Sequence, residues 1–381
     1  MIHGGTRPQD PTTSRPSTQD PRPHDPKTHP PMNKQPVSKS RILGVAAATL
    51  ALWAGAAALG LGIGSTELGG VDLFGRLLSG ELTDTEYTIL THARVPRVVF
   101  AGLVGAALAV GGAVFQAVLR NPLADPYILG ISGGAALGGT VMLVLGTLTV
   151  GAIAVGVPLG AFAGAMAALA VIFGVEKATP ASRGSTYVLL LTGVIVNAFA
   201  ASLIMFLQSV VTARQAQEIL FYLMGALSVE GTSPAVMATV AVVMALSVLI
   251  IYRYANALNA VSLGDEDAAA LGVEVKRVRT VTVTVASLAV AVAVAFSGII
   301  GFVGLVVPHA IRLVVGPDHR VLIPACAFGG AAFLTVADLM ARGGFGLIGT
   351  TLPVGVLTSM IGAPLFLYFL WRSFQQSSRW S

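Results

Sequence analysis

Residues 94–139 read RVPRVVFAGLVGAALAVGGAVFQAVLRNPLADPYILGISGGAALGG. An apolar run over residues 95–119 is followed by the turn residues N-P-L-A-D-P and then by a second apolar run. A helix rises about 1.5 Å per residue, so roughly 20 apolar residues cross a hydrocarbon layer about 30 Å thick. The many Gly and Ala residues allow membrane helices to approach one another closely. The stretch therefore predicts two transmembrane helices joined by a turn.

The composition of the whole chain extends this prediction. Of 381 residues, 54% are hydrophobic and only 11% are charged, and the mean hydropathy is +0.79. Soluble domains carry about a quarter charged residues, so a soluble class is excluded. The apolar runs are also much longer than the strands of a membrane barrel. We therefore predict an all-α, polytopic membrane protein.

Ten apolar runs bounded by charge, proline or glycine read as membrane spans. The eighth is too short to cross alone, so we expect it to extend into residues 298–305 or to be a broken helix inside the bundle. The predicted spans are 42–63, 95–119, 127–148, 153–175, 187–211, 235–252, 278–300, 306–315, 321–340 and 352–370.

The first forty residues differ from the rest in composition. Residues 1–40 are rich in Pro, Ser and Thr and contain no apolar run, which predicts a disordered tail ahead of a membrane domain over residues 41–381. No apolar h-region precedes Ile42, so we expect these residues not to act as a secretory signal. We expect residues 1–31 to be dispensable, or Met32 to be the natural start.

Charge placement predicts the orientation. With the N-terminus in the cytosol, most Lys and Arg residues after the tail fall on the cytosolic side, so both termini are expected there. Arg94, Arg97 and Arg342 fall on the outer side instead. On charge alone they could snorkel to the interface or pair with Glu81 and Glu86, or they could form a docking surface for an acidic partner.

Several chemistries are not supported by any motif. No phosphate-binding G-x-x-x-x-G-K-[ST] loop, H-E-x-x-H pair or Cys/His cluster occurs, and Cys326 is the single cysteine. We therefore expect no catalytic residue, no cofactor, no metal site and no nucleic-acid partner. Asp338 could serve an ion-coupled carrier, but Arg342 lies four residues later, which favours a structural ion pair. The energy for any transport should come from another subunit.

The largest cytosolic loop, residues 253–279, has the pattern of two short helices meeting at Gly264. Asp265 is placed to cap the second, predicted over residues 266–271, and Gly272 to end it. Small side chains there would allow close contact with another protein. A plain solvated loop is the alternative interpretation.

Four blocks of this sequence resemble the permeases of ABC importers for iron chelates and cobalamin. They are the stretch quoted above, SLGDEDAAALGVEVKRVR at 262–279, SGIIGFVGLVVPHAIRLVVGPDHRVLIPACAFGGAAFLTVAD at 297–338 and LPVGVLTSMIGAPLFLYFLWR at 352–372. Together they cover most of the chain after residue 42. The resemblance implies a ten-helix, type II importer permease in the cytoplasmic membrane. It also implies a homodimer with two ATP-binding cassette subunits on the cytosolic side and a substrate-binding protein on the outer side.

The resemblance also implies roles for individual residues. It assigns binding-protein docking to Arg94, Arg97 and Arg342. It assigns ATPase coupling to Asp265, Glu266, Ala268, Ala269, Leu271 and Gly272. It places an inner gate at Asn121 and Leu123, with a second gate at Thr186. It further relates the second to fifth helices to the seventh to tenth, as an inverted repeat.

The function that the resemblance implies is import of a large metal chelate, with a ferric siderophore first and cobalamin or haem as alternatives. Asn197 and Gln208 are candidates to line the pathway. Gln116 could line it too or could bond helix to helix. The rival classes are an ion-coupled secondary transporter, which would depend on Asp338, and a membrane scaffold without transport.

Overall fold

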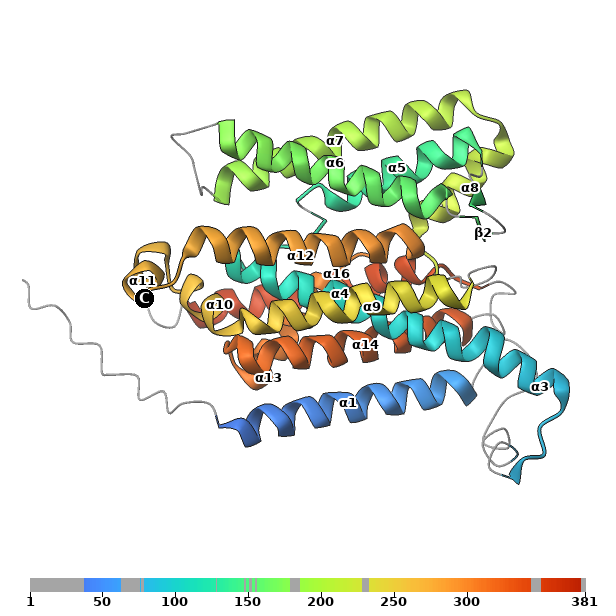
Figure 1. Cartoon of the computed structure of the whole chain (residues 1–381), viewed down its shortest axis with the longest axis horizontal. Coiled ribbons are helices and arrows are strands. Elements are labelled where there is room, and N and C mark those ends of the chain that lie inside the picture. The colour runs from blue at the N-terminus through green and yellow to red at the C-terminus, as the bar shows by residue number, and fades with distance from the viewer. Residues whose placement is uncertain are drawn as a thin grey trace, which may run out of the picture. The chain divides into compact units, whose positions relative to one another are not determined.

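Each of the ten predicted spans corresponds to a helix in the computed structural model (Figure 1). Seven are long and apolar enough to cross a membrane, and shorter apolar stretches at residues 131–145, 303–315 and 354–369 belong to the other three. The ten are α1 (Lys39–Gly62), α4 (Val95–Val118), α5 (Ile131–Leu145), α6 (Gly156–Ala178), α7 (Thr186–Val210), α9 (Pro234–Arg253), α12 (Val275–Ser297), α13 (Val303–Val315), α14 (His319–Gly343) and α16 (Val354–Ser377).

The structure describes residues 38–62, 76, 79–127, 129–146, 149–150, 153–154, 156–178, 186–227, 233–343 and 351–377. The predicted disorder of the tail concerns residues 1–37 above all, and these lie outside the described ranges. Residues Lys39–Ser381 form one compact unit.

Several short elements join the spans. Two of them begin with a capping box, which the sequence contains as T-x-x-E and T-x-x-Q. Neither of these helices was among the predicted spans. They are α3 (Asp84–Ile89), capped by Thr83, and α8 (Ala213–Met224), capped by Thr212. The π-helix η1 (Leu90–Arg94) connects α3 to α4 without a break. The remaining elements are the antiparallel strands β1 (Thr149–Val150) and β2 (Ile153–Ala154), and the helices α10 (Ala255–Val261) and α11 (Asp265–Ala270).

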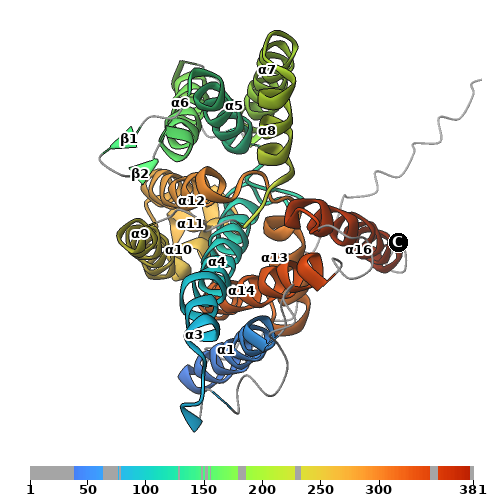
Figure 2. The same ribbon diagram turned by 90° about the vertical axis from the view of Figure 1, so that its right-hand side faces the viewer.

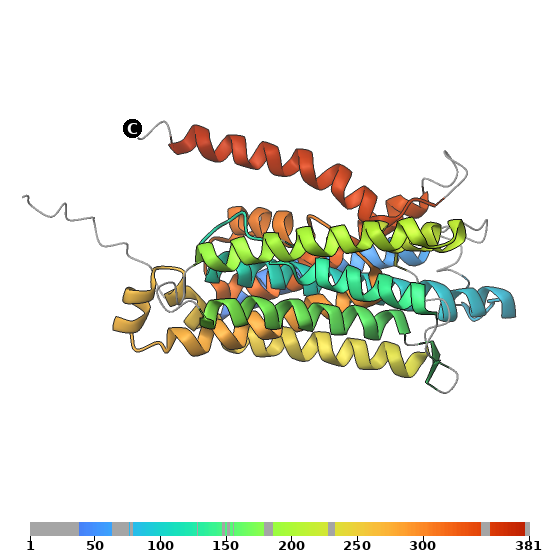
Figure 3. The ribbon, with the colours of Figure 1, turned by 90° about the horizontal axis from the view of Figure 1, so that it is seen from above.

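The bundle has two distinct ends, which Figure 1 shows on opposite sides. We call the end that carries α10 and α11 the α11 end, and the end that carries α3 and α8 the α3 end. Helix α1 begins at the α11 end, where Arg41 Nη2 donates to Val315 O at 3.0 Å, and α16 finishes there as well (Figure 3). A chain that crosses the membrane an even number of times must begin and end on the same side, as α1 and α16 do here.

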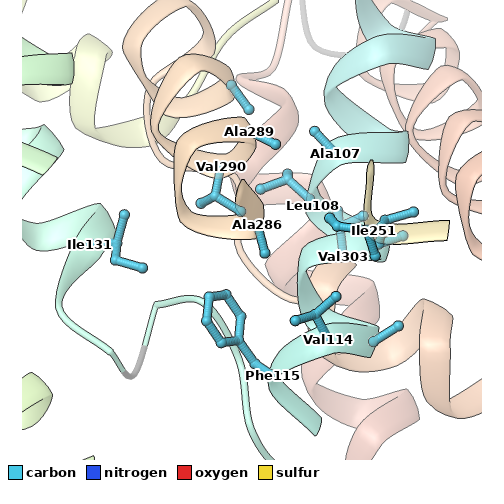
Figure 4. Packing of buried hydrophobic residues seen from close by; sticks show 14 of the residues in the cluster. Ala107, Leu108, Val114, Phe115, Ile131, Ile251, Ala286, Ala289, Val290 and Val303 are labelled. Atoms are coloured by element: carbon cyan, nitrogen blue, oxygen red, sulfur yellow. The ribbon is translucent and has the colours of Figure 1, made fainter. Parts of the chain in front are cut away.

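Helix α4 lies at the centre of the bundle, as the end-on view in Figure 2 shows. It contacts α9, α12, α13 and α14, and 18 of its 24 residues are buried. Figure 4 shows part of this contact, where Leu108 and Phe115 of α4 lie near Ala286 and Val290 of α12. Lipid is as apolar as these side chains, so van der Waals contact at close range must hold such helices together.

Helices α5 and α6 meet through facing glycines. Gly134 and Gly138 on α5 lie against Gly160 and Gly164 on α6, and a Cβ added at any of the four would meet a backbone carbonyl of the facing helix. Both pairs have the G-x-x-x-G spacing that places small residues on one helix face. The glycines therefore set how closely these two helices approach.

Two predicted spans are corrected by the structure. The eighth is α13, which gains only Val303–Leu305 from the preceding segment and remains 13 residues long, so it is the broken helix. The third, predicted from residue 127, begins as α5 at Ile131 and has 15 residues. At about 1.5 Å per residue both fall short of a roughly 30 Å layer.

The glycine contact yields a stability prediction. Gly164→Val should destabilise the protein by about 1–3 kcal/mol, because the new side chain cannot fit against the Gly134 carbonyl. Gly174→Val on the same helix is the matched control, since nothing lies within 4 Å of a Cβ there. Thermal unfolding in detergent measures both. Equal melting temperatures for the two variants would contradict the proposed packing.

Candidate functional site

The two broken helices, α5 and α13, occupy equivalent positions in the order of the spans. Helix α5 is the third span and α13 the eighth, an offset of five. Helix α5 leads away from the α11 end, and α13 leads toward it, as an inverted repeat requires. Each is preceded by a non-helical linker, described over residues 119–127 and 129–130 before α5 and over residues 298–302 before α13. Short or broken helices in corresponding positions of two repeats mark the substrate path in many transporters.

The first linker is a stiff turn. Asn121 Oδ1 accepts from the Leu123 N–H at 2.9 Å, and Asp125 Oδ1 accepts from the Tyr127 N–H at 2.8 Å. These are Asx turns, in which a short side chain takes the place of a backbone acceptor. Asn197 of α7 donates from Nδ2 to the Tyr127 carbonyl at 2.5 Å. The N-P-L-A-D-P sequence thus forms a rigid unit that is fixed to a neighbouring helix.

The start of α13, directly after the second linker, is fixed by Gln116 of α4. Its Nε2 donates to the carbonyls of Gly304 and Leu305 at 3.4 and 3.3 Å. Pro308 has no N–H, so the Gly304 carbonyl lacks its usual donor four residues later in α13. Gln116 supplies a donor in its place. Of the two roles left open for this residue, the helix-to-helix hydrogen bond is the one observed.

A cavity of about 590 Å³ lies where the two linkers meet the start of α16 and the end of α8. Apolar side chains, glycines and a few polar groups line it, and Asp125 is the one carboxylate among the described lining residues. The lining residues are Asp125, Tyr127, Leu223, Met224, Ile299, Gly301, Phe302, Leu305, Gly355, Val356, Ser359 and Met360. A mostly apolar hollow with few polar groups is the usual form of a ligand site.

None of the predicted pathway and gate residues is among the described residues that line this cavity. Asn197 and Gln208 are half-buried on α7 and are not among its lining residues, and Asn197 holds the first linker instead. Asn121 and Leu123 lie in the linker turn, where Leu123 is 37% exposed. Thr186 is the first residue of α7, and its side chain falls outside the described part of the structure.

The predicted coupling segment forms α10 and α11 at one end of the bundle. Asp265 is the first residue of α11 and does not cap it, because Gly264 occupies the N-cap position. Ala268 is fully buried, so it packs inward and cannot meet a partner. The other predicted coupling residues, Glu266, Ala269, Leu271 and Gly272, are exposed.

A polar cluster that the sequence analysis did not identify ties α10 to the turn before α14. Asn259 Nδ2 donates to Asp318 Oδ1 at 2.9 Å, and Asn259 Oδ1 accepts from the His319 N–H at 2.8 Å. The hydrogen bond from the Arg320 guanidinium holds the pKa of Asp318 well below its usual range. No sequence motif marked Asn259 as a cluster residue, because its hydrogen-bond partners lie about sixty residues away in the chain.

The three arginines predicted for the outer side converge near the end of α1. Arg97 donates from Nε and Nη2 to the Asp338 carboxylate at 2.9–3.2 Å, and Arg342 Nε lies 3.0 Å from the same carboxylate. Arg94 Nη1 donates to Leu61 O at 2.7 Å. The predicted Asp338–Arg342 ion pair is confirmed.

The three arginines differ in exposure. The Arg97 side chain is 31% exposed, whereas Arg94 and Arg342 are 5% and 6% exposed. Glu86, one of the alternative partners considered above, forms an ion pair with Arg76. Two of the three arginines therefore share the buried carboxylate of Asp338, Arg94 binds the end of α1, and Arg97 is the most exposed of the three.

The cavity carboxylate gives a pH prediction. Burial raises the pKa of Asp125 to about 6, although the hydrogen bond from the Tyr127 N–H opposes this. The unfolded value is about 4, so between about pH 4 and pH 6 the folded protein binds more protons than the unfolded chain. The ionised carboxylate therefore destabilises the fold fully only above pH 6. Asp125→Asn keeps the turn acceptor and should raise stability at pH 7–8 by about 1–3 kcal/mol.

This gain should shrink as the pH falls through 6 and vanish near 4. Thermal unfolding of the purified protein across that range measures it, with Asp267→Asn on the exposed face of α11 as the control. A gain that is constant with pH would contradict the raised pKa.

Comparisons with known proteins all indicate the same family. The FecCD transport family matches residues 50–372. The chain is 43% identical over 293 residues to the cobalamin import system permease protein of Halobacterium salinarum, covering 75% of this chain and 74% of that relative. It is 37% identical over 321 residues to the hemin transport system permease protein of Yersinia pestis, covering 84% and 94%.

A solved inward-facing conformation of a metal-chelate type ABC transporter has the same fold. The TM-score is 0.75 at 29% identity, and the match covers 87% of this chain and 99% of that one. The ten-helix architecture, the sequence match and this structural match agree. The chain therefore belongs to the FecCD transport family and is the multi-pass membrane permease of an ABC transporter.

Proposed function

We propose that this permease imports a large metal chelate across the cytoplasmic membrane, driven by ATP hydrolysis in a partner subunit. The observation that carries the proposal is the cavity at the junction of the two broken helices. Its mostly apolar wall offers few groups to hold a ligand tightly. A permease that receives its substrate from a binding protein needs to pass it on rather than retain it.

The proposed substrate is a ferric siderophore, which is the first choice among the substrates that the family resemblance implies. Cobalamin is the second candidate, because the Halobacterium relative named for cobalamin import is 43% identical to this chain over 293 residues. Uptake assays can rank ferric siderophore, cobalamin and haem against one another.

The active form in this proposal is a homodimer with the pathway along its axis. The cavity borders α16, and large apolar side chains on α16 and α7 are exposed in the single chain. Figure 3 shows α16 along one edge of the bundle. The exposed apolar residues include Leu191, Ile195, Phe199 and Phe206 on α7, and Met360, Leu367 and Trp371 on α16.

The ATPase subunits in this proposal dock at the α11 end, which faces the cytosol together with both termini. Leu263 and Leu271 flank α11 and are 63% and 66% exposed. Glu266 and Ala269 lie between them on the exposed side. Large apolar side chains at both ends of this short polar helix form a compact surface for contact with a second protein.

A first test uses the permease with its ATPase subunits in proteoliposomes. The wild-type complex should take up one of the three chelates only when ATP is supplied. Ala269→Arg should reduce ATPase co-purification and uptake at least tenfold, because a long charged side chain blocks close packing. Glu274→Lys, an exposed change at the start of α12, is the control. ATP-independent uptake that depends on Asp338 would favour the ion-coupled alternative.

A second test concerns docking of the binding protein at the α3 end. Arg97 is the exposed member of the arginine cluster and would meet a carboxylate of the partner directly, while Arg94 and Arg342 strengthen the local positive potential. Arg97→Gln should slow association on the order of threefold to tenfold at low salt. The difference should shrink as salt rises, because screening acts over about 8 Å at physiological ionic strength.

The matched control is Arg214→Gln. Arg214 is also at the α3 end and is 89% exposed, but it pairs with Glu218 and lies outside the cluster. Association kinetics on folded protein in lipid discs compare the variants. Wild-type kinetics for Arg97→Gln at every salt concentration would rule out the docking role.

A further inference from the structure

Arg120 adopts a backbone conformation that favours glycine. Its φ is +49°, and among the described non-glycine residues only Phe302 shares a positive value. Arg120 follows the last residues of α4, where the Arg120 N–H donates to Ala117 O and the Asn121 N–H to Gln116 O. These two bonds define a Schellman ending, whose left-handed position is usually glycine because a Cβ costs free energy there. The presence of arginine at a position that favours glycine indicates that the Arg120 side chain has a function of its own.

The Arg120 side chain reaches the coupling segment. Its Nη2 lies 3.5 Å from Asp265 Oδ1, at the first residue of α11. Arg279 of α12 donates from Nη2 to the same carboxylate at 3.1–3.3 Å. Asp265 therefore joins three elements, namely α11, α12 and the turn that follows α4.

The turn attached to Arg120 can transmit a displacement. Asn121, the next residue, begins the run of Asx turns that ends at Tyr127. Asp125 and Tyr127 in this run line the cavity. A pull on Arg120 would therefore move a hydrogen-bonded unit that reaches the cavity wall, whereas a flexible loop would absorb it.

We propose that Arg120 is the positioning residue that links the coupling segment to the inner gate turn, through Asp265. This rests on the proposed importer function. When ATPase closure displaces α11, Asp265 carries Arg120 and the 121–127 turn with it, while Arg279 keeps the carboxylate aligned. Asp265 thereby acts between two protein elements and needs no contact with the ATPase itself.

The decisive variant is Arg120→Gly. Glycine suits the left-handed position, so the protein should keep or raise its melting temperature, and loss of function cannot be ascribed to misfolding. The link to Asp265 is lost. Arg120→Lys retains the charge and should keep part of the function. Arg277→Gln is the control, because Arg277 forms an exposed ion pair with Glu274 in the same region.

The readout is the accessibility of the gate turn in the complete complex. Leu123→Cys, introduced with Cys326→Ala so that it is the single thiol, is labelled with a maleimide in lipid discs. The labelling rate is measured without nucleotide and with ATP plus vanadate. We expect at least a threefold change for the parent and for Arg277→Gln. Arg120→Gly should show almost none while its ATP hydrolysis continues.

Asp265→Asn should also abolish the response, and the double variant should be no worse than Asp265→Asn alone, because that variant has already lost the Arg120–Asp265 contact. A parent response that Arg120→Gly preserves would overturn the link and leave the importer function standing. A parent complex without any nucleotide response would overturn the importer function and the link together.

Discussion

A backbone carbonyl inside an apolar helix bundle must accept a hydrogen bond from a donor within the protein. The cavity between the two broken helices depends on the side chains that supply these donors. Both broken helices interrupt the regular backbone bonding of the bundle. Gln116 donates to the carbonyls at the start of α13, where Pro308 has removed a donor, and Asn197 donates to the Tyr127 carbonyl ahead of α5. Two amide side chains thus hold the first linker and the start of α13, both of which contribute to the cavity wall. A hollow at this position would otherwise expose costly unsatisfied groups.

Charge is concentrated at the two ends of the bundle and is almost excluded from its middle. At the α3 end, Arg97 and Arg342 share the buried carboxylate of Asp338. At the α11 end, Arg120 and Arg279 share Asp265. In each place one acid fixes two arginines from separate elements. The first arrangement suits a surface that meets an acidic partner, and the second suits a joint between moving parts.

The sequence predicted the helices well because each span is a long apolar run. The boundaries of α5 and α13 were harder to predict, since apolar linkers such as residues 298–302 resemble the helices that they interrupt. Helix α8 was missed because its apolar face is short, although the Thr212–Gln215 capping box marked its start. Among the site residues, the motif located Asn121 and Leu123 in the turn. Asn197 was found as a polar residue in a span, but its hydrogen bond to the linker was not foreseen.

By itself the sequence determined the membrane class, the number of spans and the Asp338–Arg342 pair, because these follow from hydropathy and from spacing within one helix. The tertiary structure decided which residues meet across the chain. Gln116 bonds to α13 some 188 residues away, and Arg97 bonds to Asp338 across 241 residues. Asp265 was singled out in the sequence as a cap, but its place between Arg120 and Arg279 depends on how α4, α11 and α12 pack. Such contacts depend on helix packing, which local patterns of hydropathy and charge do not encode.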